Sequence, residues 1–131
     1  MLDQLPEEQS RALLTRLFRE DPLTAMRIIR RHFDFPDLKY ADSAGLALVF
    51  EKVGERRMLA ALRGADDVLV RRFSAALGTR KAMTFLADLE AYAGTDAETT
   101  AARRAVLMRS MILKRSGQLK IARPDIDDKS R

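Results

Sequence analysis

Residues 79–92, TRKAMTFLADLEAY, decide the fold class, because their apolar side chains recur with the period of an α-helix. At 100° per residue, one broad face collects the apolar residues of this stretch, which are Ala82, Met83, Phe85, Leu86, Leu89 and Tyr92. Thr79 is a good N-cap for such a helix. The pattern predicts an amphipathic helix that lays this face on a core.

The charges of this predicted helix run against its macrodipole. Arg80 and Lys81 fall in the first turn, while Asp88 and Glu90 lie near the other end. Each misplaced charge costs roughly 0.3–1 kcal/mol when it is exposed. Two explanations stay open: the helix displays these charges to a partner, or neighbouring helix ends neutralise them.

Proline, glycine and capping residues divide the rest of the chain into further helices. The predicted spans are residues 6–18, 22–32 after a cap at Asp21, 44–53 after Ser43, 55–62, a helix to residue 77 after Asp66 or Asp67, and a long helix to residue 116 after Asp96. No strand pattern competes with them. Short helices joined by loops of about 2–4 residues are typical of a compact orthogonal bundle, so we expect an all-α fold.

One break interrupts the helical pattern. Pro36 disfavours helical geometry at Phe35, so the chain turns or extends after residue 32. We predict a hinge here, formed by Phe33, Phe35 and Pro36. The polar tail, residues 123–131, has the composition of a disordered segment.

The charge pattern permits several kinds of partner. With a net charge of +5, the chain carries the arginine pairs Arg30-Arg31, Arg56-Arg57, Arg71-Arg72 and Arg103-Arg104. These pairs are spread over separate predicted helices and alternate with acids, which favours solvated helix faces over a nucleic-acid surface. There is no cysteine and no uninterrupted apolar run of about 18 residues. We therefore expect a cytoplasmic protein without membrane insertion.

Residues suited to catalysis are scarce. His32 is the only histidine, and there is no cysteine and no glycine-rich nucleotide loop. The adjacent acids Asp66 and Asp67 stand at a helix start, where acids are typical caps rather than cation ligands. We expect no enzyme activity, no metal site, no cofactor and no small-molecule substrate. An interaction module is what remains.

Short motifs in a fixed order resemble those of a known family. Residues 33–38, FDFPDL, are similar to the linker Met-Phe-Val-Phe-Glu-Asp-Leu of the C-terminal domain of the flagellar motor switch protein FliG. Residues 42–53 follow that family's next motif without a gap, and residues 59–65, LAALRGA, resemble its Leu-Ala-Leu-Ala-Leu-Lys-Gly-Ala. Residues 87–91, ADLEA, resemble Glu-Asp-Leu-Glu-Ala. The resemblance covers residues 21–121.

This resemblance implies a rotor-type module whose helix over residues 79–92 faces the stator and transmits torque. It implies that Arg63, Arg80 and Asp88 occupy the charged, stator-facing positions, opposite charges on a stator protein of the MotA type. Ala87 stands where the family often has an acid. A FliG-like scaffold or regulatory adaptor that has lost the torque role is therefore the alternative.

The resemblance also implies a domain organisation. Residues 1–32 match the last helices of an armadillo-like segment, residues 33–36 a hinge linker, residues 37–122 the C-terminal helical bundle, and residues 123–131 a tail. The expected fold is an armadillo-like helix pair followed by a compact six-helix orthogonal bundle. The family's domains that bind FliF and FliM have no counterpart here, so we expect either a fragment or a short stand-alone homologue. The initiating Met and the polar tail favour the stand-alone homologue. Expected partners are FliG, FliM and MotA types at the cytoplasmic face of the basal body, and a homo-oligomer is left open.

Overall fold

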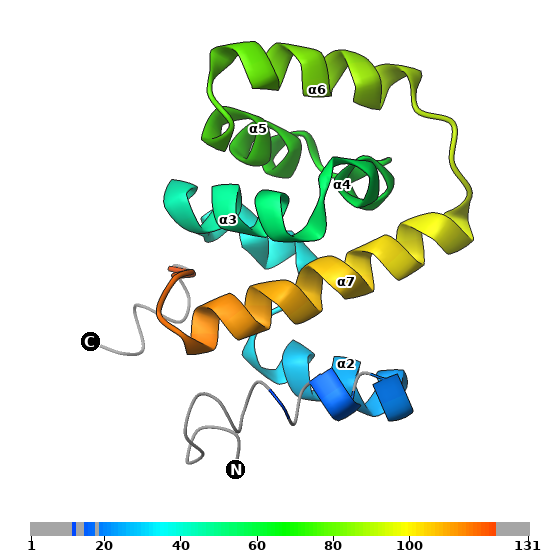
Figure 1. The fold of residues 1–131 in the computed structure, drawn as a ribbon, viewed down its shortest axis with the longest axis vertical. Coiled ribbons are helices and arrows are strands. Elements are labelled where there is room, and N and C mark those ends of the chain that lie inside the picture. The colour runs from blue at the N-terminus through cyan, green and yellow to red at the C-terminus, as the bar shows by residue number, and fades with distance from the viewer. Residues whose placement is uncertain (1–11, 13–14, 18, 123–131) are drawn as a thin grey trace.

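The computed structural model describes residues 12, 15–17 and 19–122, and nearly every element of this part of the chain is a helix (Figure 1). The elements are α2 (Pro22–His32), the 3-10 helix η2 (Phe35–Tyr40), α3 (Ser43–Val53), α4 (Glu55–Leu62), α5 (Asp67–Ala76), α6 (Thr79–Ala91) and α7 (Asp96–Arg115). Within the described ranges, the extended pairing is one isolated antiparallel bridge between Ala41 and Ile121. The predicted all-α class is confirmed. The tail and most of the predicted helix over residues 6–18 lie outside the described residues.

Short polar side chains begin several of these helices. Asp21 caps α2 by accepting a hydrogen bond from the backbone N–H of Thr24, and Pro22 follows it in the first turn. Asp66 caps α5 by accepting from the N–H of Val68. Both caps agree with the sequence prediction.

Other predicted caps are wrong by one residue. The observed caps are Asp42 in place of Ser43, Gly78 in place of Thr79, and Thr95 in place of Asp96. In two of these places a second capping residue stands one position earlier, and its side chain reaches the free N–H groups of the first turn. Before α6, Gly78 supplies a positive φ of 86°, so Thr79 is already helical and makes no capping hydrogen bond.

The hydrophobic core collects side chains from every helix named above. Its largest fully buried members are Ile29, Phe33, Leu38, Leu46, Met58, Leu62, Leu69, Phe73, Phe85, Met111 and Leu119. In Figure 1 α7 runs between α2 on one side and α3 and α4 on the other, so both sides of this helix pack against neighbours. Burial of this apolar surface is the main term that holds the helices together.

The outermost helix is α6, which lies across α5 and α4 (Figure 1). Phe85 is its one buried side chain, and the ring of Phe85 meets that of Phe50 edge-on, with centroids 5.1 Å apart. A helix attached along one side in this way leaves most of its surface to solvent.

The two ends of the bundle meet at the bridge between Ala41 and Ile121. The N–H of Asp42 donates to the carbonyl of Lys120 over 3.0 Å, and the N–H of Lys120 donates to the Asp42 carboxylate over 2.8 Å. Gly45, in the first turn of α3, lies directly beneath Leu119. The segment after α7 therefore returns to the start of α3 and closes the bundle there.

The predicted hinge segment is well packed. Phe33 and Phe35 are buried, with 1% and 6% of their surface exposed, whereas Pro36 is exposed in the first turn of η2. Asp34 and Asp37 form a reciprocal capping box that begins η2. The chain leaves α2 after residue 32, as predicted, and then forms the 3-10 helix η2. Neither the hinge role nor the division into segments is tested by this arrangement, and both stay predictions.

Candidate functional site

The exposed side of α6 carries most of the candidate site. Arg80 and Asp88 are both exposed, and they stand eight positions apart in the sequence, which is about 12 Å along a helix axis. At that separation the two side chains cannot pair with each other. They are two distinct points of opposite charge on one helix.

The reversed charges of α6 lie in solvent. Arg80, Lys81, Asp88 and Glu90 are all exposed, and within the part of the chain that the structure describes none of them forms an ion pair. The backbone carbonyl of Arg80 accepts a hydrogen bond from the Thr84 hydroxyl, which leaves the guanidinium uninvolved. Glu55, in the first turn of α4, lines the same hollow as Arg80 and Lys81 but forms no ion pair with either of them. Both explanations considered above are therefore compatible with the geometry.

Apolar side chains stand beside these charges. Met83 and Leu86 are 69% and 41% exposed, although the helical pattern placed both on the buried face. That prediction is wrong because the apolar arc of α6 is wider than its contact with α5 and α4, so the residues on one edge of the arc stay in solvent. Exposed apolar groups next to exposed charges are typical of a surface that binds another protein.

Arg63 is in a different environment from Arg80. It follows the last turn of α4, and its Nη1 donates to Asp96 Oδ1 over 2.9 Å and to Thr99 Oγ1 over 3.3 Å. Its side chain is 36% exposed, against 98% for Asp96. Arg63 therefore connects the end of α4 to the start of α7, while Arg80 and Asp88 share α6.

The start of α7, next to Arg63, has a complete capping box. The N–H of Glu98 donates to Thr95 Oγ1, and the carboxylate of Glu98 accepts from the Thr95 N–H over 2.9 Å and from its hydroxyl over 3.0 Å. These hydrogen bonds hold the pKa of Glu98 below its ordinary value, the backbone N–H having the larger effect. The ionised carboxylate is thus tied to the helix start.

We expect this capping box to lose strength in acid. Because the folded-state pKa of Glu98 is lowered, its contribution to stability is complete above the unfolded value and disappears as the pH falls through the folded value. The melting temperature of wild type should exceed that of Glu98→Gln most at neutral pH, and the difference should shrink towards about pH 3. Thermal unfolding followed by circular dichroism measures it. A difference that does not change with pH would contradict this assignment.

The described part of the chain offers little for other kinds of chemistry. No group of three or more histidine, cysteine, aspartate or glutamate side chains gathers there in a way that could hold a metal ion. Among the same residues, no helix combines the length and apolar character needed to cross a bilayer.

Comparison with known proteins gives a consistent result. The family model of the FliG C-terminal domain matches residues 15–121. The flagellar motor switch protein FliG of Aquifex aeolicus is 29% identical over 91 residues, which are 70% of this chain and 28% of that protein. FliG of Thermotoga maritima is 29% identical over 90 residues, 69% of this chain and 27% of that protein. The chain thus spans less than a third of either relative.

Solved structures show the same fold. Full-length FliG from Aquifex aeolicus superposes with a TM-score of 0.65 at 26% identity, covering 89% of this chain and 37% of that one. A structure of FliG residues 116–343 from H. pylori superposes with a TM-score of 0.64 at 18% identity, covering 91% of this chain and 53% of that one.

Proposed function

Because the chain belongs to the FliG C-terminal domain family, we propose that it is a rotor-side module of a flagellar motor switch, whose α6 presents Arg80 and Asp88 to a charged stator protein. The observation that carries the proposal is the state of α6, an outer helix whose exposed charges of both signs have no ion-pair partner among the described residues. A partner with complementary charges would supply the ion-pair partners of Arg80 and Asp88.

The strength of such a contact suits repeated engagement. Each solvent-exposed ion pair contributes roughly 0.2–1 kcal/mol and weakens as salt is added. Two such contacts about 12 Å apart bind weakly and release quickly, while their opposite signs fix the direction in which a partner lies. Met83 and Leu86, which are exposed on the same helix, add apolar area between partner and rotor.

Arg63 is less available to a partner than Arg80 and Asp88. Its guanidinium is already bonded to Asp96 and Thr99, so an acid on the stator has to share or displace these groups. We assign it a smaller contribution to partner binding than Arg80 and Asp88.

The proposal also includes where the module works, how it moves and which rotor proteins it binds. The module works at the cytoplasmic face of the basal body, and it turns about a hinge at Phe33, Phe35 and Pro36 that separates the bundle over residues 37–122 from an armadillo-like segment. Its proposed partners on the rotor are FliG- and FliM-type subunits, since the relatives it matches are flagellar motor switch proteins.

Charge reversal on α6 is the direct test. In the native host, Arg80→Glu and Asp88→Lys should each reduce the spreading rate in soft agar, and the double variant should reduce it further. Helical circular dichroism of the purified variants should stay unchanged, because both side chains are exposed and form no ion pair among the described residues. Reversing the opposing charge on the stator should restore motility to the matching variant.

Arg71→Glu is the matched control. The Arg71 side chain is 79% exposed on α5, and its contact with Asp67 at 3.6 Å is a solvated pair, so this reversal makes the same change of net charge as Arg80→Glu without touching α6. Normal swimming of the Arg80→Glu, Asp88→Lys double variant would contradict the proposal that α6 transmits torque.

One observation favours the second candidate, a FliG-like scaffold or regulatory adaptor. Ala87 is exposed where the family often has an acid, and Arg63 forms an ion pair with Asp96. Few charged side chains on the stator-facing surface are therefore available to a partner. A pull-down from the native host that recovers non-flagellar proteins and no rotor or stator protein would support the adaptor over the torque module.

A further inference from the structure

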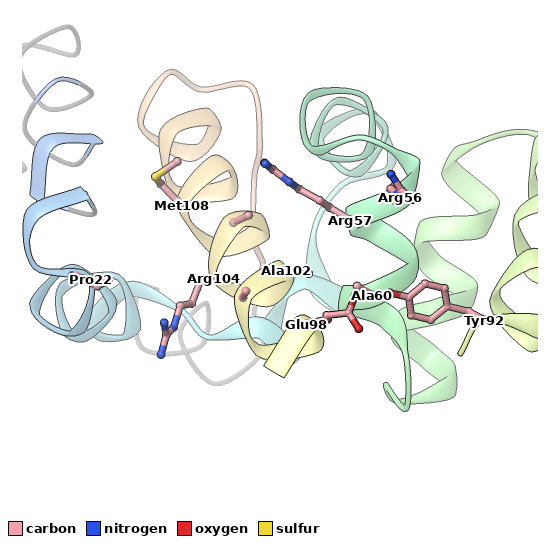
Figure 2. A pocket seen from close by; sticks show the side chains of 11 residues that line it. Pro22, Arg56, Arg57, Ala60, Tyr92, Glu98, Ala102, Arg104 and Met108 are labelled. Atoms are coloured by element: carbon pink, nitrogen blue, oxygen red, sulfur yellow. The ribbon is translucent and has the colours of Figure 1, made fainter. Parts of the chain in front are cut away.

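A groove separate from the α6 charges lies between α4 and α7 and reaches the first residue of α2 (Figure 2). Its volume is about 600 Å³. It is lined by Pro22, Arg56, Arg57, Ala60, Tyr92, Glu98, Ala101, Ala102, Arg104, Ala105 and Met108, which include none of the charged residues of α6. The proposed stator contact therefore leaves this groove unused.

The floor of the groove is made of small side chains. Ala60 of α4 and Ala102 of α7 are each 5% exposed and form its base, while Ala101 and Ala105 continue it along α7. The lining from Glu98 to Met108 extends over ten positions of α7, which is about 15 Å or nearly three helical turns. Alanine surfaces let a second helix approach within the short end of the usual 8–10 Å range of interaxial distances.

The rim of the groove is basic. Arg56 and Arg57 are exposed on α4, Arg104 is half-buried on α7, and none of the three forms an ion pair within the residues that the structure describes. The one acid of the lining, Glu98, is already hydrogen-bonded to Thr95. Besides these hydrogen bonds, which lower the pKa of Glu98 most, Arg56 lies close enough to contribute to lowering it, so the rim is positive on balance, with Arg57 and Arg104 as its least compensated charges.

The neighbouring residue shows that this pattern is not general. Arg103 adjoins Arg104 in the sequence, but its guanidinium donates to the carbonyls of Ala61 and Arg63 and lies over the Phe35 ring. The sequence suggested that the arginine pairs 56-57 and 103-104 are simply solvated. In the structure Arg103 holds the fold together, while Arg56, Arg57 and Arg104 form the basic rim of the groove.

We propose that this groove docks an acidic amphipathic helix of a partner polypeptide, with its apolar face on the alanine floor and its Asp or Glu side chains against Arg56, Arg57 and Arg104. A helix fits better than a compact anion, because the rim arginines do not converge on one point. In Figure 2 Arg57 extends across towards Met108, whereas Arg104 lies on the other side of the alanines and points away from α4. An occupant that reaches all three must extend along α7.

The test is selection of helix-forming peptides of about 14 residues, displayed on phage, against the whole purified protein. Enriched peptides should carry acids on both flanks of an apolar stripe. Fluorescence anisotropy of the most enriched peptide should show that Arg57→Glu and Arg104→Glu each weaken binding by about three- to tenfold, and that the two effects accumulate. Ala105→Trp, which fills the groove without altering charge, should abolish binding.

Arg80→Glu and Arg71→Glu are matched controls, because each makes the same change of net charge away from the groove; both should bind the peptide as wild type does. Enrichment of peptides without acids, or binding that survives both groove reversals, would overturn the proposal. Tighter binding to duplex DNA than to any peptide, lost in the same variants, would overturn it in favour of a nucleic-acid surface. Since the readout is peptide affinity, the result is independent of whether α6 transmits torque.

Discussion

Replacing Arg103 with alanine should lower the free energy of unfolding by about 2–4 kcal/mol. Its Nε donates to the Ala61 carbonyl over 2.8 Å and its Nη2 to the Arg63 carbonyl over 3.1 Å. These carbonyls lie at the end of α4, where no intrahelical donor is available. The guanidinium also lies 4.9 Å from the Phe35 ring centroid. The alanine variant leaves both of these part-buried carbonyls without a hydrogen-bond donor. It also removes the cation–π contact with Phe35.

Arg104→Ala is the control for this prediction. Arg104 is the next residue and makes no hydrogen bond or ion pair within the described ranges, so its loss should change stability by less than about 0.5 kcal/mol. Arg103→Lys should recover only part of the loss, because an ammonium cannot hold two carbonyls with a planar fork. Urea denaturation followed by circular dichroism gives all three values. Equal effects of the two alanine substitutions would show that Arg103 does not secure the end of α4.

Gly45→Ala should destabilise the protein by about 1–3 kcal/mol, although alanine is the better helix former by about 1 kcal/mol. A Cβ built at Gly45 would lie 2.6 Å from Asp42 Oδ1 and 3.0 Å from the Leu119 backbone Cα, and it would also overlap the Leu119 side chain. The Asp42 carboxylate caps α3 and accepts from Lys120, so displacing it weakens the closure of the bundle as well.

Ala44→Gly separates packing from helix propensity. Ala44 is exposed in the same turn, so its replacement should cost about 1 kcal/mol through propensity alone. Combining Gly45→Ala with Leu119→Ala should cost less than the sum of the two single changes, since the smaller side chain at 119 makes room for the new methyl group. A higher melting temperature for Gly45→Ala than for wild type would show that the contact between α3 and residue 119 is looser than the structure indicates.

The sequence predicted most of the helices because their ends depend on neighbouring residues. Pro22 after Asp21, and Gly54 between α3 and α4, act within a turn of where they stand. The caps that were misplaced by one residue, such as Thr95 for Asp96, lie where two competent side chains adjoin and only geometry selects between them. Periodicity identified α6 but not how much of its apolar arc is covered, which depends on α4 and α5.

The candidate site was predictable only in part. Arg80 and Asp88 are exposed on one helix, as the pattern indicated, while the ion pair between Arg63 and Asp96 joins residues 33 positions apart and left no local signal. The role of Arg103 depends on carbonyls about 40 residues away. The groove was missed for the same reason, since its alanines look like ordinary helix formers until α4 packs beside α7.

The meeting of residues 41 and 121 has a mechanical consequence. Both ends of the bundle leave it at one place, joined by the bridge and by the hydrogen bonds between Asp42 and Lys120. A sideways push on α6, which lies at one edge of the bundle in Figure 1, is therefore resisted at this junction as well as where α2 packs against α7.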